Sequence, residues 1–214
     1  MGTYKKGILG FIRGKVGTVV GAVWNGIHYL KSLPDISPDR KPTQAQRNQQ
    51  LRFAVVQAFL KPLKLLLEVG YQSFTHGVTP LNAATSYHLK FAVTGVSPDY
   101  EIDYPKVIFS VGNLEEPQMP GITTGGTAKI DFDWGALVNL DEGAATDRAS
   151  FMVYNPTLKK YVVVRDVVAR SMMAFSLIVP AAWIGHDVHC YMAFVSLDGK
   201  KVSNSAYAGV MPVI

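Results

Sequence analysis

The sequence predicts a mainly β protein with a helical segment, and three observations support this fold class. From about residue 96 onward, short β-prone runs alternate with turn residues. Residues 43–70 carry apolar side chains at helical spacing. Near the N-terminus, Asn25-Gly26 separates two further β-prone runs. Together these patterns predict an N-terminal extended arm and β-hairpin, one or two helices, and a C-terminal seven-stranded sandwich of the immunoglobulin or fibronectin-III type.

The composition is that of an ordered globular protein of 214 residues. Hydrophobic residues make up 48% of the chain and charged residues 17%. The single cysteine, Cys190, excludes an internal disulfide. No apolar run is long enough to span a membrane. We expect three parts: a glycine-rich basic arm with hairpin and linker over 1–42, a helical segment over 43–95, and the sandwich over 96–214.

The charge is unevenly distributed along the chain. Residues 1–64 contain eleven Lys and Arg against two acidic residues, a net charge of +9. The remaining residues contain ten Lys and Arg against fourteen acidic residues, a net charge of −4. Opposite charges on the two halves favour head-to-tail attraction between copies, or contact of the basic end with an anionic partner.

The glycine-rich N-terminus favours strands over a helix. Six glycines stand between residues 7 and 26, and each costs a helix about 0.8–1 kcal/mol relative to alanine. The runs 19–24 and 27–32 flank the turn dipeptide and predict a hairpin. Residues 2–17 then form an extended arm, which we expect to seek a groove or a sheet edge. The apolar run after Lys5 and Lys6 is interrupted too soon for a signal peptide, so the sequence predicts cytoplasmic synthesis and leaves the final compartment open.

The helical segment has clear boundaries. Thr43 and Gln46 form a capping box after a proline-containing linker. Pro62 lies inside the helical pattern and is expected to kink or divide the helix, which ends near Gly70. A second, shorter helix is expected from Thr79-Pro80 to about residue 91.

The sandwich strands are expected at seven places. Trp134 suits the sandwich core, as do the alternating residues Tyr191, Ala193 and Val195. The expected strands lie near 104–111, 127–134, 149–154, 160–164, 172–178, 187–197 and 201–208.

No motif in the chain predicts an enzyme, a cofactor or a metal site. The run from Gly10 to Lys15 is one residue short of a phosphate-binding loop. His186 and His189 would point to opposite faces of a strand, so they are not expected to share a metal ion. Cys190 alternates with Val188 and is expected to be a buried thiol.

Acidic residues recur at alternate positions in two places. Asp99, Glu101 and Asp103 form one set, and Asp131 with Asp133 forms the other. Each set could bind calcium or act in acid–base chemistry, but a solvated strand face is the expected role.

The sequence resembles two kinds of protein. Near the N-terminus the residues that carry the first resemblance are Gly14-Lys15-Val16-Gly17, Val20-Gly21, Trp24, Gly26 and Pro34, followed by Pro42 to Arg47 and Phe53. Near the C-terminus they are Trp183, Gly185, Tyr191, Phe194, Ser203, Ser205, Tyr207 and Gly209. In these residues the chain resembles an uncharacterised family of Bacteroidota-type bacteria whose members have about this length. This resemblance implies no activity. The lead into the first helix, with Arg47 and Arg52-Phe53, also resembles small structural proteins of tailed phages, which implies an assembly subunit.

These patterns lead to a hypothesis of a non-enzymatic subunit that self-assembles through its N-terminal arm, with another copy of the chain as partner. The alternatives are a sandwich whose loops bind a glycan or a protein, using aromatics such as Tyr100, Tyr104 or Trp183, and nucleic-acid binding by the basic half. Trp24 is open to two interpretations, as a core anchor or an exposed contact. The residues expected at the assembly surface are Ile8, Phe11, Arg13, Lys15, Val16, Val19, Val20, Trp24, Asn25 and Gly26.

Overall fold

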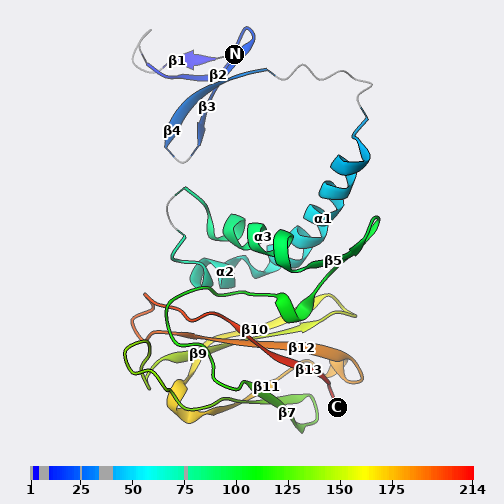
Figure 1. The fold of residues 1–214 in the computed structure, drawn as a ribbon, viewed down its shortest axis with the longest axis vertical. Helices are drawn as coiled ribbons and strands as arrows, with labels where there is room; N and C mark the ends of the chain where they lie inside the picture. The colour runs from blue at the N-terminus through cyan, green and yellow to red at the C-terminus, as the bar shows by residue number, and fades with distance from the viewer. Residues whose placement is uncertain (1, 5–9, 25, 34–40, 75–76) are drawn as a thin grey trace. The chain divides into compact units, whose positions relative to one another are not determined.

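The computed structural model describes residues 2–4, 10–24, 26–33, 41–74 and 77–214, and its fold is drawn in Figure 1. The chain divides into two compact units, residues 1–46 and 47–214, which are described separately. Among the described residues, no helix is long and apolar enough to cross a membrane.

The first unit contains one antiparallel sheet in the order β1-β2-β3-β4. Its strands are β1 (Thr3–Tyr4), β2 (Ile12–Val16), β3 (Val19–Trp24) and β4 (Ile27–Ser32). The predicted hairpin is confirmed with its predicted bounds, and Gly26 has the positive φ of +80° that its turn requires. The predicted arm differs from expectation, because residues 14–16 pair with β3 and residues 12 and 13 pair with β1. Strand-prone residues next to a hairpin add to its edge, which satisfies their main-chain groups locally.

Three helices and two short 3₁₀ turns precede the sandwich, and the first helix begins at Gln44, just before the second unit. The predicted capping box is confirmed, since the Gln46 N–H donates to Thr43 Oγ1 at 3.3 Å and the Thr43 N–H donates to Gln46 Oε1 at 3.0 Å. Pro62 divides the helix as predicted, and Thr79 caps the third helix by accepting from the Asn82 N–H. The elements are α1 (Gln44–Leu60), η1 (Lys61–Leu63), α2 (Lys64–Gly70), α3 (Pro80–Phe91) and, later in the chain, η2 (Tyr104–Lys106).

Seven strands form the β-sandwich. One sheet has the order β11-β8-β7 and the other β10-β9-β12-β13. The strands are β7 (Gly121–Gly126), β8 (Lys129–Asp133), β9 (Arg148–Asn155), β10 (Lys160–Ala169), β11 (Ala174–Ile178), β12 (Asp187–Val195) and β13 (Ala206–Pro212), with 3₁₀ turns η3 (Arg170–Met172) and η4 (Ala181–Trp183). Side chains of both sheets, such as Phe132 and Phe151, form a buried core between them, which also contains Trp134 directly after β8. The mainly β fold class with a helical segment is therefore confirmed.

The helices add a third layer, which packs on the outer face of the four-stranded sheet (Figure 1). Phe59 and Leu67 of the helices share a buried cluster with Met152, Tyr191 and Ala193 of the sheet. Strands β9 and β12 are consequently buried on both faces. This layer corrects the expectation for Tyr191 and Ala193: they contact the helices, whereas their neighbours Cys190, Met192 and Phe194 fill the sandwich core.

Near the start of the sandwich, one expected strand is not formed and one observed strand was not expected. Residues 104–111 form η2 and an extended connection, in which Val107 and Phe109 are buried against the helices. The first sandwich strand is β7, in which three of the six residues are glycine, a residue that disfavours strands. A separate hairpin of β5 (Val93–Val96) and β6 (Asp99–Ile102) precedes both.

The C-terminal segment is tied to the sandwich. Met211 and Val213 are buried in its core. The Ile214 carbonyl accepts from the Ala128 N–H at 2.6 Å, and the Val213 carbonyl accepts from the Gly185 N–H at 2.8 Å. The apolar end of the chain therefore packs on its own unit.

Candidate functional site

Eight of the ten residues expected at the assembly surface lie in the described part of the N-terminal unit, in its strands or next to them. Paired residues of neighbouring strands lie on the same face, and successive rows alternate between faces. Lys15, Val20 and Lys31 form one row across β2, β3 and β4. The next row contains Gly14, Gly21 and Leu30, on the opposite face. The sheet therefore has two faces of different composition.

One face is partly covered by the chain itself. The Phe11 ring stacks on the His28 ring, with 3.7 Å between centroids and 16° between planes. Ile12 passes over Gly21, where a Cβ atom would overlap the Ile12 carbonyl oxygen. Glycine at position 21 thus lets the start of β2 fold over β3. Leu30 lies on this face and remains exposed.

The other face is open and combines apolar with basic side chains. Trp24 pairs with Ile27, and Ala22 with Tyr29. Trp24 is 53% exposed and Ile27 is 61% exposed, so neither side chain is buried within its own unit. Of the two interpretations of Trp24, the exposed position is the one observed. We call this surface the open face; its members are Arg13, Lys15, Val20, Ala22, Trp24, Ile27, Tyr29 and Lys31.

Strand β4 presents an unpaired edge within the described residues. The Leu33 N–H donates to the Thr18 carbonyl, on the β3 side, at 2.8 Å. Main-chain direction alternates along a strand, so Ser32, Leu30 and His28 turn their N–H and C=O groups away from β3. This edge can accept another strand.

The expected surface residues do not all lie together. Arg13, Lys15, Val20 and Trp24 belong to the open face. Phe11, Val16 and Val19 lie with the partly covered face, and Gly26 forms the turn. Ile8 and Asn25 lie outside the described residues.

Four residues of β4 complete the open face or its edge and were not among the expected surface residues: Ile27, Tyr29, Leu30 and Lys31. Strict alternation along the predicted hairpin could have assigned Ile27, Tyr29 and Lys31 to the face of Trp24.

The histidine cluster does not converge on one point. His186 Nδ1 lies 3.1 Å from Asn155 Nδ2, whereas His189 Nδ1 lies 2.9 Å from the Tyr207 hydroxyl. Burial lowers the pKa of His189, which favours its neutral form. Burial also raises the pKa of the Cys190 thiol to about 12, so this thiol is inert at neutral pH. Among the described residues, no group of three or more His, Cys, Asp and Glu is placed to hold a metal ion.

The two acidic sets take up different positions. Asp131 and Asp133 share the outer face of β8, where their carboxylates lie over Gly125 and Gly121 of β7. Asp131 accepts a hydrogen bond from Ser176 at 2.5 Å and lies 3.9 Å from the Lys129 ammonium. Such pairing fits a solvated strand face.

The other acidic set and the aromatic residues considered for ligand binding are dispersed. Asp99 and Glu101 lie on β6, while Asp103 pairs with Lys106 at 2.6 Å. Trp183 is buried in the sandwich core, so it does not belong to a ligand-binding surface. Tyr100 and Tyr104 are half-buried.

Comparison with known proteins gives one family. The model of a family of unknown function, DUF6266, matches residues 10–209. This range includes β2–β4 and most of the sandwich. No curated protein matches the chain.

Proposed function

We propose that the chain, which belongs to the DUF6266 family over residues 10–209, is a non-enzymatic structural subunit that assembles with copies of itself through its N-terminal sheet. The observation that carries this proposal is the open face, where Trp24, Ile27 and Tyr29 are exposed beside the unpaired edge of β4. Another copy of the chain is the partner.

Burial of the open face supplies the energy for docking. Burying one large apolar side chain contributes about 1.5–3 kcal/mol. A small isolated sheet has too little core to recover this energy internally. Contact with a neighbouring copy would bury Trp24, Ile27 and Tyr29 together, and aromatic residues of this kind commonly anchor interfaces.

Main-chain pairing at the edge of β4 would fix the register of a strand from the neighbouring copy. A neighbouring strand could exchange main-chain hydrogen bonds with His28, Leu30 and Ser32. Protein edges are usually protected by charges, bulges or proline. Lys31 is the only charged residue in β4, which contains no proline. Main-chain pairing at this edge and burial of the exposed side chains can therefore occur in the same contact.

The remainder of the chain suits a scaffold. The order β11-β8-β7 against β10-β9-β12-β13 supports an immunoglobulin or fibronectin-III-like sandwich, a fold that serves many binding and structural roles. If the docking operation does not close on itself, the product is an open filament, as in surface or phage-like assemblies.

The test compares the full chain with a variant lacking residues 2–32, using light scattering after size-exclusion chromatography and electron microscopy. We expect concentration-dependent assemblies from the full chain and monomers from the deletion variant. Assemblies of unchanged size after the deletion would contradict the proposal.

A pair of substitutions at one position separates the edge from the side chain. Leu30→Pro removes an outward N–H while keeping the hydrogen bonds between β3 and β4. Leu30→Ala shortens the same side chain and keeps the N–H. Under edge pairing, Leu30→Pro weakens assembly more than Leu30→Ala does, and equal effects would exclude the edge.

Nucleic-acid binding is the second candidate, because Lys15 and Lys31 lie in one row beside Tyr29 and Trp24. Exposed aromatics between basic residues can stack on single-stranded bases. A mobility shift with single-stranded DNA that weakens at high salt would favour this candidate. No shift at any salt concentration would exclude it.

A further inference from the structure

One end of the sandwich displays apolar side chains to solvent. Val138 is 77% exposed, Leu140 82% and Leu197 64%. They belong to residues 136–144, which follow β8, and to the turn between β12 and β13. We call the surface formed by residues 138–142 and 196–198 the sandwich-end surface. Exposed aliphatic residues grouped on loops commonly mark contact sites.

Buried polar groups hold this loop in place. The Glu115 carboxylate accepts from the Asn139 N–H at 2.6 Å and from the Val138 N–H at 3.1 Å. The Glu115 N–H donates to the Glu142 carbonyl at 2.8 Å. Glu115 is itself 7% exposed. The loop is therefore preorganised, so a partner loses little affinity to ordering it.

A buried ion pair between Arg170 and Asp147 lies next to the main chain of Glu115. Arg170 donates to the Glu115 carbonyl at 2.8 Å and lies 3.4 Å from the Asp147 carboxylate. Asp147 also accepts from the Ala144 N–H at 2.9 Å. Both ends of the loop are thus fixed by groups that are almost completely buried. A buried ion pair thus holds a loop whose apolar side chains are exposed to solvent.

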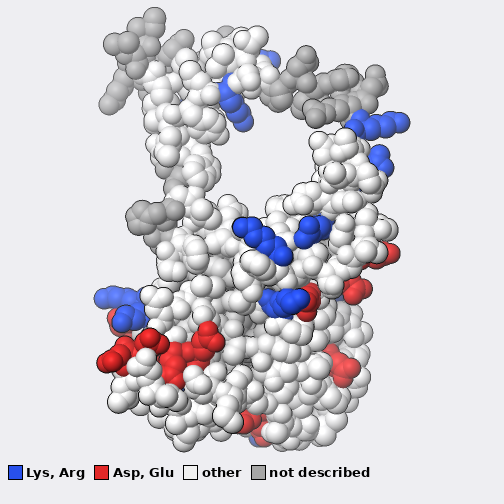
Figure 2. Space-filling view, in the orientation of Figure 1, with Lys and Arg blue, Asp and Glu red and all other residues white. Residues whose placement is uncertain are grey.

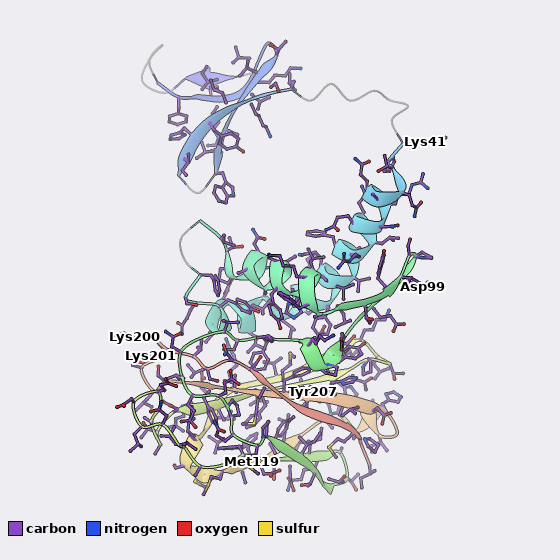
Figure 3. The ribbon with its side chains drawn as sticks, viewed as in Figure 1. Lys41, Asp99, Met119, Lys200, Lys201 and Tyr207 are labelled. Atoms are coloured by element: carbon purple, nitrogen blue, oxygen red, sulfur yellow. The ribbon has the colours of Figure 1, made fainter. Side chains whose placement is uncertain are left out.

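The surface is also acidic and hollowed. Asp141, Glu142 and Asp198 line a depression of about 360 Å³, together with Asp147 and Lys201. Figure 2 shows acidic side chains gathered at this end of the sandwich, and Figure 3 labels Lys200 and Lys201 beside it. A depression of this size lies within the range of pockets that receive small ligands.

The open face of the N-terminal sheet is its complement. Arg13, Lys15 and Lys31 are exposed, and the first 33 residues of the sequence contain no Asp or Glu. Each surface thus combines exposed apolar side chains with charge, and the charges are of opposite sign. Opposite charges steer encounter and fix orientation, while apolar contact supplies most of the energy.

We propose that the sandwich-end surface of one copy receives the open face of the N-terminal sheet of another copy. This inference rests on the proposed function and names the surface that receives the sheet. Because the two surfaces differ, the contact is heterologous and repeats from copy to copy, giving a ring or an open fibre.

Charge reversal tests the pairing in the full chain at low ionic strength. We expect Asp141→Lys with Glu142→Lys to raise the concentration needed for assembly by at least about tenfold, because like charges then face each other. Lys15→Glu with Lys31→Glu should have the same effect. Combining all four substitutions should restore assembly, since the charges are again opposite.

The matched control is Asp99→Lys with Glu101→Lys on β6. It makes the same change of net charge on another acidic set and should leave assembly unchanged. Circular dichroism would verify that each variant keeps its fold.

The outcomes distinguish the two proposals. The sandwich-end surface is not the receiver if charge reversal at Asp141 and Glu142 leaves assembly as unchanged as the control does. The same conclusion follows if the variant with all four substitutions does not assemble. The proposed function still stands in that case, provided that deletion of residues 2–32 abolishes assembly. A full chain that stays monomeric at every concentration overturns both.

Discussion

At the scale of single residues, Arg170 connects the sandwich core to its end loop. Its guanidinium lies 3.9 Å from the centre of the Phe194 ring, besides its contacts with Asp147 and Glu115. Burial lowers the pKa of Arg170, while the carboxylates of Asp147 and Glu115 act in the opposite direction. A charge that is buried to this extent is tolerated only because its partners are in place.

We predict that Arg170→Met destabilises the protein by about 3–5 kcal/mol, because Asp147 then remains buried without its cation. Urea unfolding followed by tryptophan fluorescence measures the change. In the double variant with Asp147→Asn, which keeps a turn acceptor and removes the charge, about half of the loss should return. An Arg170→Met variant as stable as the parent would show that this ion pair contributes nothing.

The Glu115 carboxyl is also held by hydrogen bonds that set its charge state. Burial alone would raise its pKa, but hydrogen bonds from the Asn139 and Val138 N–H groups and the charge of Arg170 outweigh burial, so the pKa is lowered. The carboxylate is therefore charged at neutral pH, and its contribution to stability is lost only as the pH falls below the ordinary value of 4.5. Sequence reasoning could not identify Glu115, because its partners stand 23 or more residues away.

At the scale of elements, the helices belong to the core of the second unit. Leu67 of α2 is fully buried, whereas Leu65 of the same helix is 66% exposed. Tyr161 of β10 reinforces the contact by donating to the Phe59 carbonyl at 2.7 Å. The helix layer and the four-stranded sheet should therefore unfold together.

We predict that Leu67→Ala costs about 2–5 kcal/mol, since it leaves a cavity between helix and sheet. Leu65→Ala, the matched control, should change stability by less than about 0.5 kcal/mol. Thermal unfolding followed by circular dichroism compares the two. Similar melting temperatures for both variants would mean that the helices are not part of the cooperative unit.

Local sequence signals predicted the elements that local chemistry determines. The hairpin around Gly26, the capping box at Thr43 and the break at Pro62 are all confirmed. Strand β7 was missed because half of its residues are glycine, which disfavours strands, and because it is held by pairing with β8. The prediction that Tyr191 lies in the sandwich core was wrong, because a strand buried on both faces shows no alternation of apolar and polar residues.

At the scale of the whole molecule, both hydrophobic clusters lie within residues 47–214. We predict that deleting residues 2–32 shifts the melting temperature by no more than about 4 °C, because no core residue of either cluster is removed. Differential scanning calorimetry at low protein concentration measures this shift. A large decrease would show that the N-terminal sheet stabilises the rest of the chain.

Sequence patterns point to one of the two surfaces in the proposed contact. Charge asymmetry and the apolar hairpin indicated the N-terminal surface, because both are local properties. The loop of the sandwich-end surface, the proposed receiver, is held by Glu115, Asp147 and Arg170, which come from distant segments. Only the folded sandwich shows that they organise one loop.

The buried Cys190 gives the protein its own reporter of breathing motions. This thiol lies at 0% exposure between the two sheets of the sandwich. A thiol-reactive dye can reach it only when the sheets separate, so the labelling rate counts opening events. Because the chain has no other cysteine, the unaltered sequence would tell whether a subunit inside an assembly opens less often than a free one.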